Sequence, residues 1–248
     1  MKFTQHYTVK WHDTDVNRRV RPAQLLMYMQ ETAGAHFSHE AMSLDEMRDT
    51  KGLAFLLSSI SICIYDALYA YDEIDVQTWV CEGRGLSYNR CFCILRNGQV
   101  VAEAASVWAL LDLNTHRLLK AEEEPFHIEP ENNLQLVTLP KRLRVPALEH
   151  MELAGERQIV YSDIDYNGHM NNTHYPDLFC DYTPDICGKS VTGMMFSFLH
   201  EASYGHVLKV YRMETEDGYL FRTVDENGTV CTDAFLRTEP FTGLEKRE

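Results

Sequence analysis

The sequence predicts an α+β fold of two similar units in tandem, each an antiparallel sheet wrapped around one helix. Three observations favour this fold. A long helical pattern is followed by four strand-length runs, a polar and proline-marked segment divides the chain, and the pattern that opens the first half returns in the second. We place the first unit at residues 1–135 and the second at residues 146–248.

The first unit begins with "TQHYTVKWHDTD", which alternates polar and bulky residues like a strand. Pro22 suits the first turn of a helix, so we expect "PAQLLMYMQETAGAHFSHEAM" to be helical. One face of that helix carries Leu25, Met29, Thr32, Ala33, Ala35 and His36. The following runs, "LAFLLSSISICIY", "EIDVQTWVCEGRG", "YNRCFCILRNG" and "QVVAEAASVWALLDL", are rich in β-branched and aromatic residues and predict four strands.

The second unit follows the polar run "LKAEEEPFHIEPENNLQLVTLP", which we interpret as a linker. It opens with the strand-like "ERQIV" and continues with a helix near Asn172 to Tyr182, shorter than the first helix. Three further strand-rich stretches complete it: "KSVTGMMFSFLHEASYGHVLKVYRMETED", "GYLFRTVDE" and "GTVCTDAFLRTE". Asn97-Gly98 and Asn227-Gly228 each stand between two strand-like runs, so we expect both to form type I′ hairpin turns.

An internal repeat links the two units. The segment "YSDIDYNGHM" from Tyr161 aligns without a gap on "WHDTDVNRRV" from Trp11. The alignment sets Asp163 on Asp13, Asp165 on Asp15, Asn167 on Asn17, His169 on Arg19 and Met170 on Val20. The two Asn-Gly pairs recur in the same order along each unit. We therefore infer an internal duplication in which only the second copy carries the imidazole.

Composition excludes several classes of protein. The formal charge of −14 disfavours nucleic acid as a partner, since phosphate binding draws on clustered Lys and Arg. No apolar run reaches the roughly 18 residues of a membrane-spanning helix, so we expect no membrane insertion. Seven cysteines without a C-x-x-C pair favour reduced thiols in a cytoplasmic protein. We expect no metal and no cofactor.

The polar run of the second unit resembles a known family. Asp165, Asn167, His169, Asn171 and Asn172 match the D-x-N-x-H-x-N-N pattern that opens the second unit of the acyl-acyl carrier protein thioesterases of plastids and bacteria. The resemblance implies two tandem hotdog units. In "FLHEASYGHVL" the acid of the family falls on Glu201, and Ala202 stands where the family often has a cysteine. This chain therefore has no thiol there to act as a nucleophile.

The chemistry of thioester hydrolysis fits these residue types. A polarised carbonyl and an activated water or carboxylate are needed. We assign Asp165, His169 and Glu201 to activating water or attacking the carbonyl, and Asn167 to positioning; which carboxylate acts as base stays open. If the run is extended, its alternate residues from Asp163 to His169 share one face. Asn171 or Asn172 is expected to cap the following helix, and the apolar neighbours of Glu201 predict a buried carboxylate.

The resemblance implies hydrolysis of fatty acyl-acyl carrier protein, which releases free fatty acid and ends chain elongation, with the first unit as the acyl-binding half. An acyl-coenzyme A thioesterase or a non-catalytic acyl-thioester-binding protein are the alternatives, and a hotdog dehydratase is disfavoured. The expected partner is an acidic acyl carrier protein, and the chain is expected to be a monomer or a homodimer. The candidate docking residues are Arg18, Arg19, Arg21, Lys141, Arg142 and Arg144.

Overall fold

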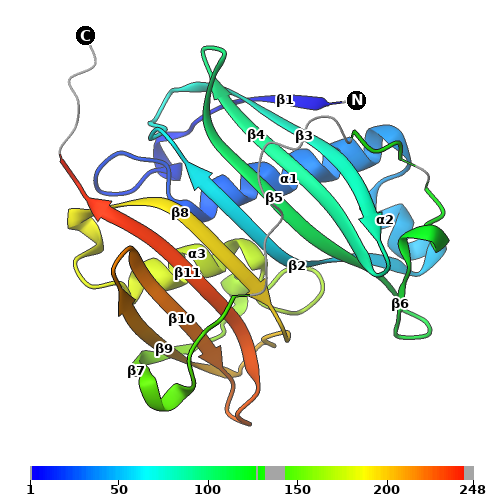
Figure 1. The fold of residues 1–248 in the computed structure, drawn as a ribbon. Helices are drawn as coiled ribbons and strands as arrows, with labels where there is room; N and C mark the ends of the chain where they lie inside the picture. Colours follow the sequence, from blue (N-terminus) through cyan, green and yellow to red (C-terminus); the bar gives the residue numbers. More distant parts are fainter. Residues whose placement is uncertain (1, 127, 132–142, 243–248) are drawn as a thin grey trace.

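The computed structural model describes residues 2–126, 128–131 and 143–242, and its strands form one continuous antiparallel sheet (Figure 1). The strands of the first half are β1 (Phe3–Thr8), β2 (Leu53–Ile64), β3 (Glu73–Arg84), β4 (Ser87–Arg96), β5 (Gln99–Asp112) and β6 (Arg117–Leu119). Those of the second half are β7 (Glu152–Gln158), β8 (Lys189–Phe198), β9 (Val207–Thr215), β10 (Gly218–Val224) and β11 (Val230–Pro240). The predicted α+β fold is confirmed.

Strand order makes the two halves mirror each other. The order is β1-β3-β4-β5-β2-β8-β11-β10-β9-β7, with β6 paired to β5. The central strands β2 and β8 join the halves, and their register places Ser61 opposite Met195. On either side of that pair, Ile60 faces Phe196 and Ile62 faces Met194. Each half is therefore a hotdog unit, and the tandem arrangement inferred from the resemblance is confirmed.

Both helices pack on the same face of the sheet. In the view of Figure 1, α1 (Pro22–Glu40) lies behind β2 to β5, and α3 (Tyr175–Asp181) lies behind β8 to β11. The helix begins at Pro22 as predicted, and five of the six residues assigned to its inner face are buried; Ala35 is half-buried. The second helix is shorter, also as predicted. One apolar core contains residues of both units, so neither helix packs against its own strands alone.

Short helical turns connect these elements. In the first half they are η1 (Trp11–Asp13), α2 (Leu44–Glu46), η2 (Met47–Lys51) and η3 (Ala121–Glu123). In the second they are η5 (Leu148–His150), η6 (Tyr161–Asp163), η7 (Asn172–His174) and η8 (Ile186–Gly188). Of the helices in the described part of the chain, none is long and apolar enough to cross a membrane. The limit expected for the first unit, residue 135, lies outside the described residues.

The internal repeat is present in the backbone. The turns η1 and η6 occupy equivalent places, each followed by a small antiparallel bridge: Thr14 with Val20, and Ile164 with Met170. The amides after those bridges also match, since Val20 N donates to Leu68 O and Met170 N to Ala202 O, each at 2.8 Å. The alignment made from the sequence is therefore confirmed at the level of individual hydrogen bonds.

The two Asn-Gly turns differ. Between β4 and β5, Asn97 and Gly98 both have positive φ, 53° and 75°, which confirms the type I′ turn. Between β10 and β11 only Gly228 has positive φ, 84°, so the type I′ prediction is wrong there. The Asp225 carboxylate accepts hydrogen bonds from Asn227 N at 2.9 Å and Thr229 N at 2.7 Å. This aspartate imposes a different turn, because its side chain takes over backbone donors.

Candidate active site

The candidate loop, residues 165–169, is a turn. Asp165 Oδ1 accepts from Asn167 N at 2.8 Å, Asp165 N donates to His169 O at 3.0 Å, and Gly168 has a φ of 83°. The run is therefore a loop, and the single shared face expected if the run were extended is not formed. Asp163 lies in η6 and is buried, whereas the Asp165 and His169 side chains belong to the loop. Because Asp225 to Thr229 makes the same turn, the Asp-x-Asn-Gly sequence itself accounts for the local fold.

His169 and Glu201 meet across a short bridge. His169 pairs with Ser203 in an isolated antiparallel bridge, which brings the two chain segments side by side. His169 Nε2 and Glu201 Oε2 are 3.0 Å apart, and their side chains are 33% and 60% exposed. The structure thus brings together this predicted imidazole and carboxylate. Contrary to expectation, Glu201 is exposed, because it lies just after the end of β8 and not within the strand.

Asn167 receives a partner from the first unit. Its Oδ1 accepts a hydrogen bond from the Arg48 guanidinium, and its Nδ2 lies 3.3 Å from Asp165 Oδ2. Arg48 belongs to η2, far from the loop in sequence, and its Cζ lies 5.4 Å from the centroid of the Tyr166 ring. No pattern in the sequence singles out Arg48, because its role depends on how the two units pack.

Asn171 caps the short helical turn η7. Its Oδ1 accepts from Thr173 N at 3.0 Å and from Thr173 Oγ1 at 2.9 Å, which confirms the predicted cap. Ala202 is buried, and its carbonyl accepts from Met170 N. The position next to Glu201 therefore contributes backbone to the site and no nucleophile.

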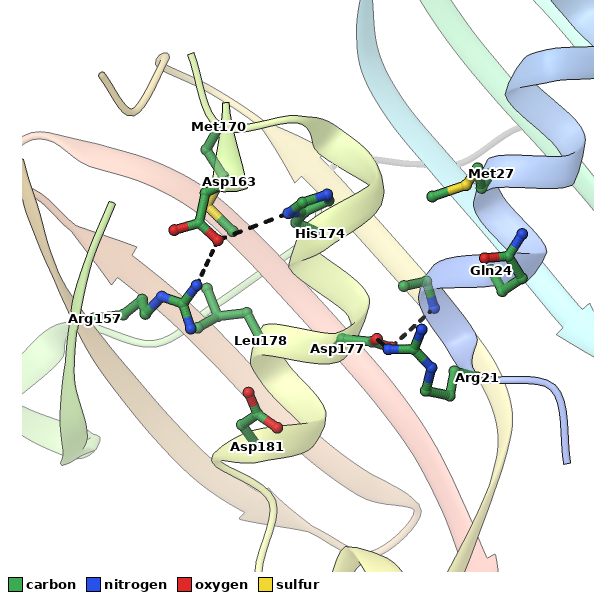
Figure 2. Close-up of a pocket in the computed structure, with 11 residues that line it drawn as sticks. Arg21, Gln24, Met27, Arg157, Asp163, Met170, His174, Asp177, Leu178 and Asp181 are labelled. Carbon is green, nitrogen blue, oxygen red and sulfur yellow. Dashed lines mark hydrogen bonds and ion pairs between the residues drawn. The ribbon is translucent and has the colours of Figure 1, made fainter. Parts of the chain in front are cut away.

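A pocket of about 260 Å³, lined by both charged and apolar side chains, lies between α1 and α3 (Figure 2). On one side, buried Asp163 accepts from Val160 N at 2.9 Å, pairs with Arg157 and lies 3.7 Å from His174 Nδ1. On the other, Asp177 Oδ2 lies 2.5 Å from Arg21. Burial raises the Asp177 pKa, an effect that the charge of Arg21 opposes. None of Asp165, Asn167, His169 and Glu201 lines this pocket, so it is separate from the candidate loop.

The expected docking residues have different fates. Arg19 is not free, since its side chain is 11% exposed and donates to Lys189 O at 2.7 Å and to Asp15. Arg21 is engaged by Asp177. Arg18 and Arg144 are exposed. Lys141 and Arg142 lie outside the described residues.

Cysteines and possible metal ligands add no chemistry to the loop. Cys91 and Cys93 are buried beside Trp79 and Ala105 in a small apolar cluster, where they pack as small hydrophobic residues. Within the described residues, no group of three or more His, Cys, Asp or Glu side chains is placed to hold a metal ion.

The comparisons with known proteins agree with one another. The family model of the acyl-ACP thioesterase N-terminal domain matches residues 1–128, and that of the C-terminal domain matches residues 150–235. A chloroplastic palmitoyl-acyl carrier protein thioesterase of Cuphea hookeriana is 22% identical over 197 residues, 73% of this chain and 47% of that protein. A chloroplastic oleoyl-acyl carrier protein thioesterase 2 of Arabidopsis thaliana is 25% identical over 194 residues, 70% of this chain and 52% of that protein. The chain thus spans about half the length of these curated relatives.

Solved structures share the fold over nearly the whole chain. An acyl-ACP thioesterase from Bacteroides thetaiotaomicron superposes with a TM-score of 0.85 at 22% identity and covers 96% of this chain and 98% of its own. The 12:0-ACP thioesterase from Umbellularia californica gives a TM-score of 0.78 at 14% identity, with 97% and 98% covered. Because the two family models together account for most of its residues, this chain belongs to the acyl-ACP thioesterase family.

Proposed function

We propose that this chain hydrolyses the thioester of fatty acyl-acyl carrier protein and releases free fatty acid. The observation that carries the proposal is the His169–Glu201 pair, 3.0 Å apart, whose imidazole belongs to the same loop as the Asn167 amide in a chain of this family. Relatives named for palmitoyl, oleoyl and 12:0 substrates support a fatty acyl group and leave its length open. The first unit, as predicted, would hold the acyl chain.

The geometry supports a water-mediated mechanism. His169 Nε2 donates to Glu201, so the neutral imidazole keeps Nδ1 as a proton acceptor. His169 takes a proton from water as the water oxygen forms a bond with the acyl carbon. When the carbon–sulfur bond breaks, the imidazolium returns that proton to the leaving thiolate, and Glu201 stabilises the imidazolium in between.

The other two loop residues have supporting roles in this mechanism. Asn167 Nδ2 donates one hydrogen to Asp165 Oδ2, at 3.3 Å, and we assign its second hydrogen to the acyl oxygen, where negative charge develops. Asp165 forms the turn through Oδ1 and orients the Asn167 amide through Oδ2. The proposal therefore assigns proton transfer to His169, stabilisation of its imidazolium to Glu201 and positioning to Asp165.

A thiol-release assay tests the function. The wild-type chain is compared on acyl carrier protein and coenzyme A thioesters of short to long acyl chains. We expect a higher kcat/KM on the carrier-protein substrates, and a loss of about 100-fold or more in kcat in His169→Ala and in Glu201→Gln. Asn227→Ala is the matched control, since Asn227 occupies the same kind of turn in a distant hairpin. Faster turnover of the coenzyme A substrates would contradict the proposal and favour an acyl-coenzyme A thioesterase. Binding of substrate without turnover would favour a non-catalytic acyl-thioester-binding protein.

Docking of the acidic carrier protein is a separate proposal that rests on exposed arginines. Arg18 and Arg144 are exposed candidates, and Arg21 is exposed as well but is paired with Asp177. Reversing both charges, with Arg18→Glu and Arg144→Glu, is expected to raise KM several-fold for acyl carrier protein substrates and to leave KM for a small thioester unchanged. An equal rise for both substrates would remove these arginines from docking.

A further inference from the structure

We infer that Arg48 of the first unit is a positioning residue for the Asn167 amide of the second. The inference rests on the proposed function of the loop and extends it to a residue of the other unit. The Arg48 guanidinium donates to Asn167 Oδ1, which fixes the amide with its oxygen toward Arg48 and its nitrogen toward Asp165.

Arg48 is held firmly enough to act in this way. Its neighbour Met47 is 1% exposed and packs in an apolar cluster with Phe37, Leu53 and Leu110. The segment ends at Gly52, which has a φ of 65° and whose amide donates to Arg48 O at 3.0 Å. The buried Met47 side chain and the turn at Gly52 therefore hold the backbone of Arg48 in place, and its side chain reaches Asn167 of the other unit.

The internal repeat shows what the contact changes. In the first unit, the equivalent Asn17 also contacts the other unit, but it donates from Nδ2 to Cys187 O at 2.7 Å. A backbone carbonyl engages the nitrogen end of that amide, whereas Arg48 engages the oxygen end of Asn167. The two copies therefore hold the amide by opposite ends, and only in the second unit does a cation bind its oxygen within the described residues.

Charge adds to orientation. A hydrogen bond from a guanidinium to the amide oxygen polarises the amide and strengthens its N–H donors, since linked hydrogen bonds reinforce one another. That benefit is greatest when the acyl oxygen carries negative charge, so Arg48 should affect turnover more than substrate binding.

A double-mutant cycle tests the inference on acyl carrier protein substrates. Arg48→Met keeps the aliphatic length and is expected to lower kcat about 10-fold with KM within about 3-fold, while Arg48→Lys is intermediate. The Arg48→Met, Asn167→Ala double variant should be no slower than Asn167→Ala alone. Lys51→Met, a charge removed from the same turn, is the control and should match wild type. Full additivity, an effect on KM alone, or wild-type kcat in Arg48→Met would each overturn the inference.

A second readout does not depend on turnover. In ¹⁵N-labelled protein, Arg48→Met should shift the side-chain amide resonances of Asn167 and leave those of Asn227 unchanged, because Asn227 makes the same turn without an arginine. Unshifted Asn167 resonances would overturn the inference even in an inactive protein. A wild-type chain that releases no thiol, with the shift present, would instead remove the proposed function and keep the contact. Equal unfolding midpoints for Arg48→Met and Lys51→Met exclude a general loss of folding as the cause.

Discussion

The two copies of the loop, residues 15–19 and 165–169, share a backbone and differ in chemistry. In both, the aspartate carboxylate accepts the amide of the asparagine two positions later at 2.8 Å. Arg19 stands in place of His169 and, by the matching backbone bridges, Ala67 in place of Glu201; Val16 and Arg18 stand in place of Tyr166 and Gly168. The aspartate and asparagine therefore fold the turn in either copy, and the imidazole and its acid are found in the copy to which we assign catalysis.

The first copy instead holds the units together. Arg19 donates to Lys189 O and to Ser190, and its Cζ lies 4.5 Å from the centroid of the Phe241 ring. Asn17 adds the bond to Cys187. The same turn thus carries the proposed catalytic histidine in one unit and contacts between the units in the other. The positions at which the two copies differ are therefore the ones that separate the two roles.

The largest expected effect comes from exchanging the identities of the two copies. His169→Arg with Glu201→Ala gives the second loop the residues of the first, and kcat for thiol release should fall about 100-fold or more because the acid–base pair is gone. Adding Arg19→His and Ala67→Glu to that variant should restore nothing, since Cys187 O holds the Asn17 amide by its nitrogen end, opposite to the end by which Arg48 holds Asn167. Recovered turnover in this fourfold variant would show that the first copy retained a working site.

The helix α1 is longer than α3, and near its end it carries a buried histidine whose titration should affect stability. His36 lies near the end of α1, is 4% exposed, and accepts from Arg90 at Nδ1, 3.0 Å away. Burial, with a contribution from the Arg90 charge, lowers the His36 pKa from 6.5 to about 4. Between these values the unfolded chain binds more protons than the folded one, so this contribution to stability is complete above pH 6.5 and is lost as pH falls toward 4.

The size of that effect is about 3 kcal/mol at most, from a shift between 6.5 and about 4. His36→Asn keeps an acceptor for Arg90 but does not titrate. Its free energy of urea unfolding should therefore fall less steeply than that of wild type between pH 6.5 and 4. Parallel curves for the two proteins would mean that His36 is protonated in the folded state over this range.

The comparison also shows how far the sequence predicts the molecule. Pro22, the helical face of α1 and the β-branched runs predict the elements correctly, because each reflects local geometry that packing reinforces. The repeat predicts the mirrored units, and the family pattern brings His169 and Glu201 together.

The errors in the prediction have local causes. The run before His169 alternates like a strand, yet the Asp165 carboxylate accepts a hydrogen bond from the Asn167 backbone amide, which folds the run into a turn. The Asn167-Gly168 pair was the available signal, since such pairs favour positive φ. No sequence pattern predicts the contact between Arg48 and Asn167, because that contact depends on how η2 packs against the other unit.

A third prediction separates the buried aspartates that precede the two loops. Asp163 faces the cationic Arg157, whereas Asp13 accepts from two neutral donors, Lys10 N at 3.0 Å and Tyr28 Oη at 2.7 Å. Asparagine can replace an acceptor of neutral donors but cannot balance a guanidinium. Asp163→Asn should cost about 2 kcal/mol in the free energy of unfolding, and Asp13→Asn about 1 kcal/mol or less.

Urea titrations of both variants, with Arg157→Met and the Asp163→Asn, Arg157→Met double variant, check this difference. The double variant should lose less than the sum of the two single changes, because each single change leaves one partner unpaired. Equal costs for Asp13→Asn and Asp163→Asn would contradict the assignment of the guanidinium pairing as the difference between the two aspartates.

The smallest expected effect lies at the fourth position of each turn, where the backbone is left-handed in both copies. Gly168 has a φ of 83° and Arg18 a φ of 62°. An added Cβ at Gly168 would meet no atom within 4 Å, so Gly168→Ala should cost only the backbone strain, about 1 kcal/mol. Arg18→Gly relieves the same strain but increases the freedom of the unfolded chain, so its net gain should be below about 1 kcal/mol. A lower unfolding temperature for Gly168→Ala and a higher one for Arg18→Gly would show that one turn geometry governs both copies. A lower unfolding temperature for Arg18→Gly would mean that the Arg18 side chain makes contacts that outweigh the strain.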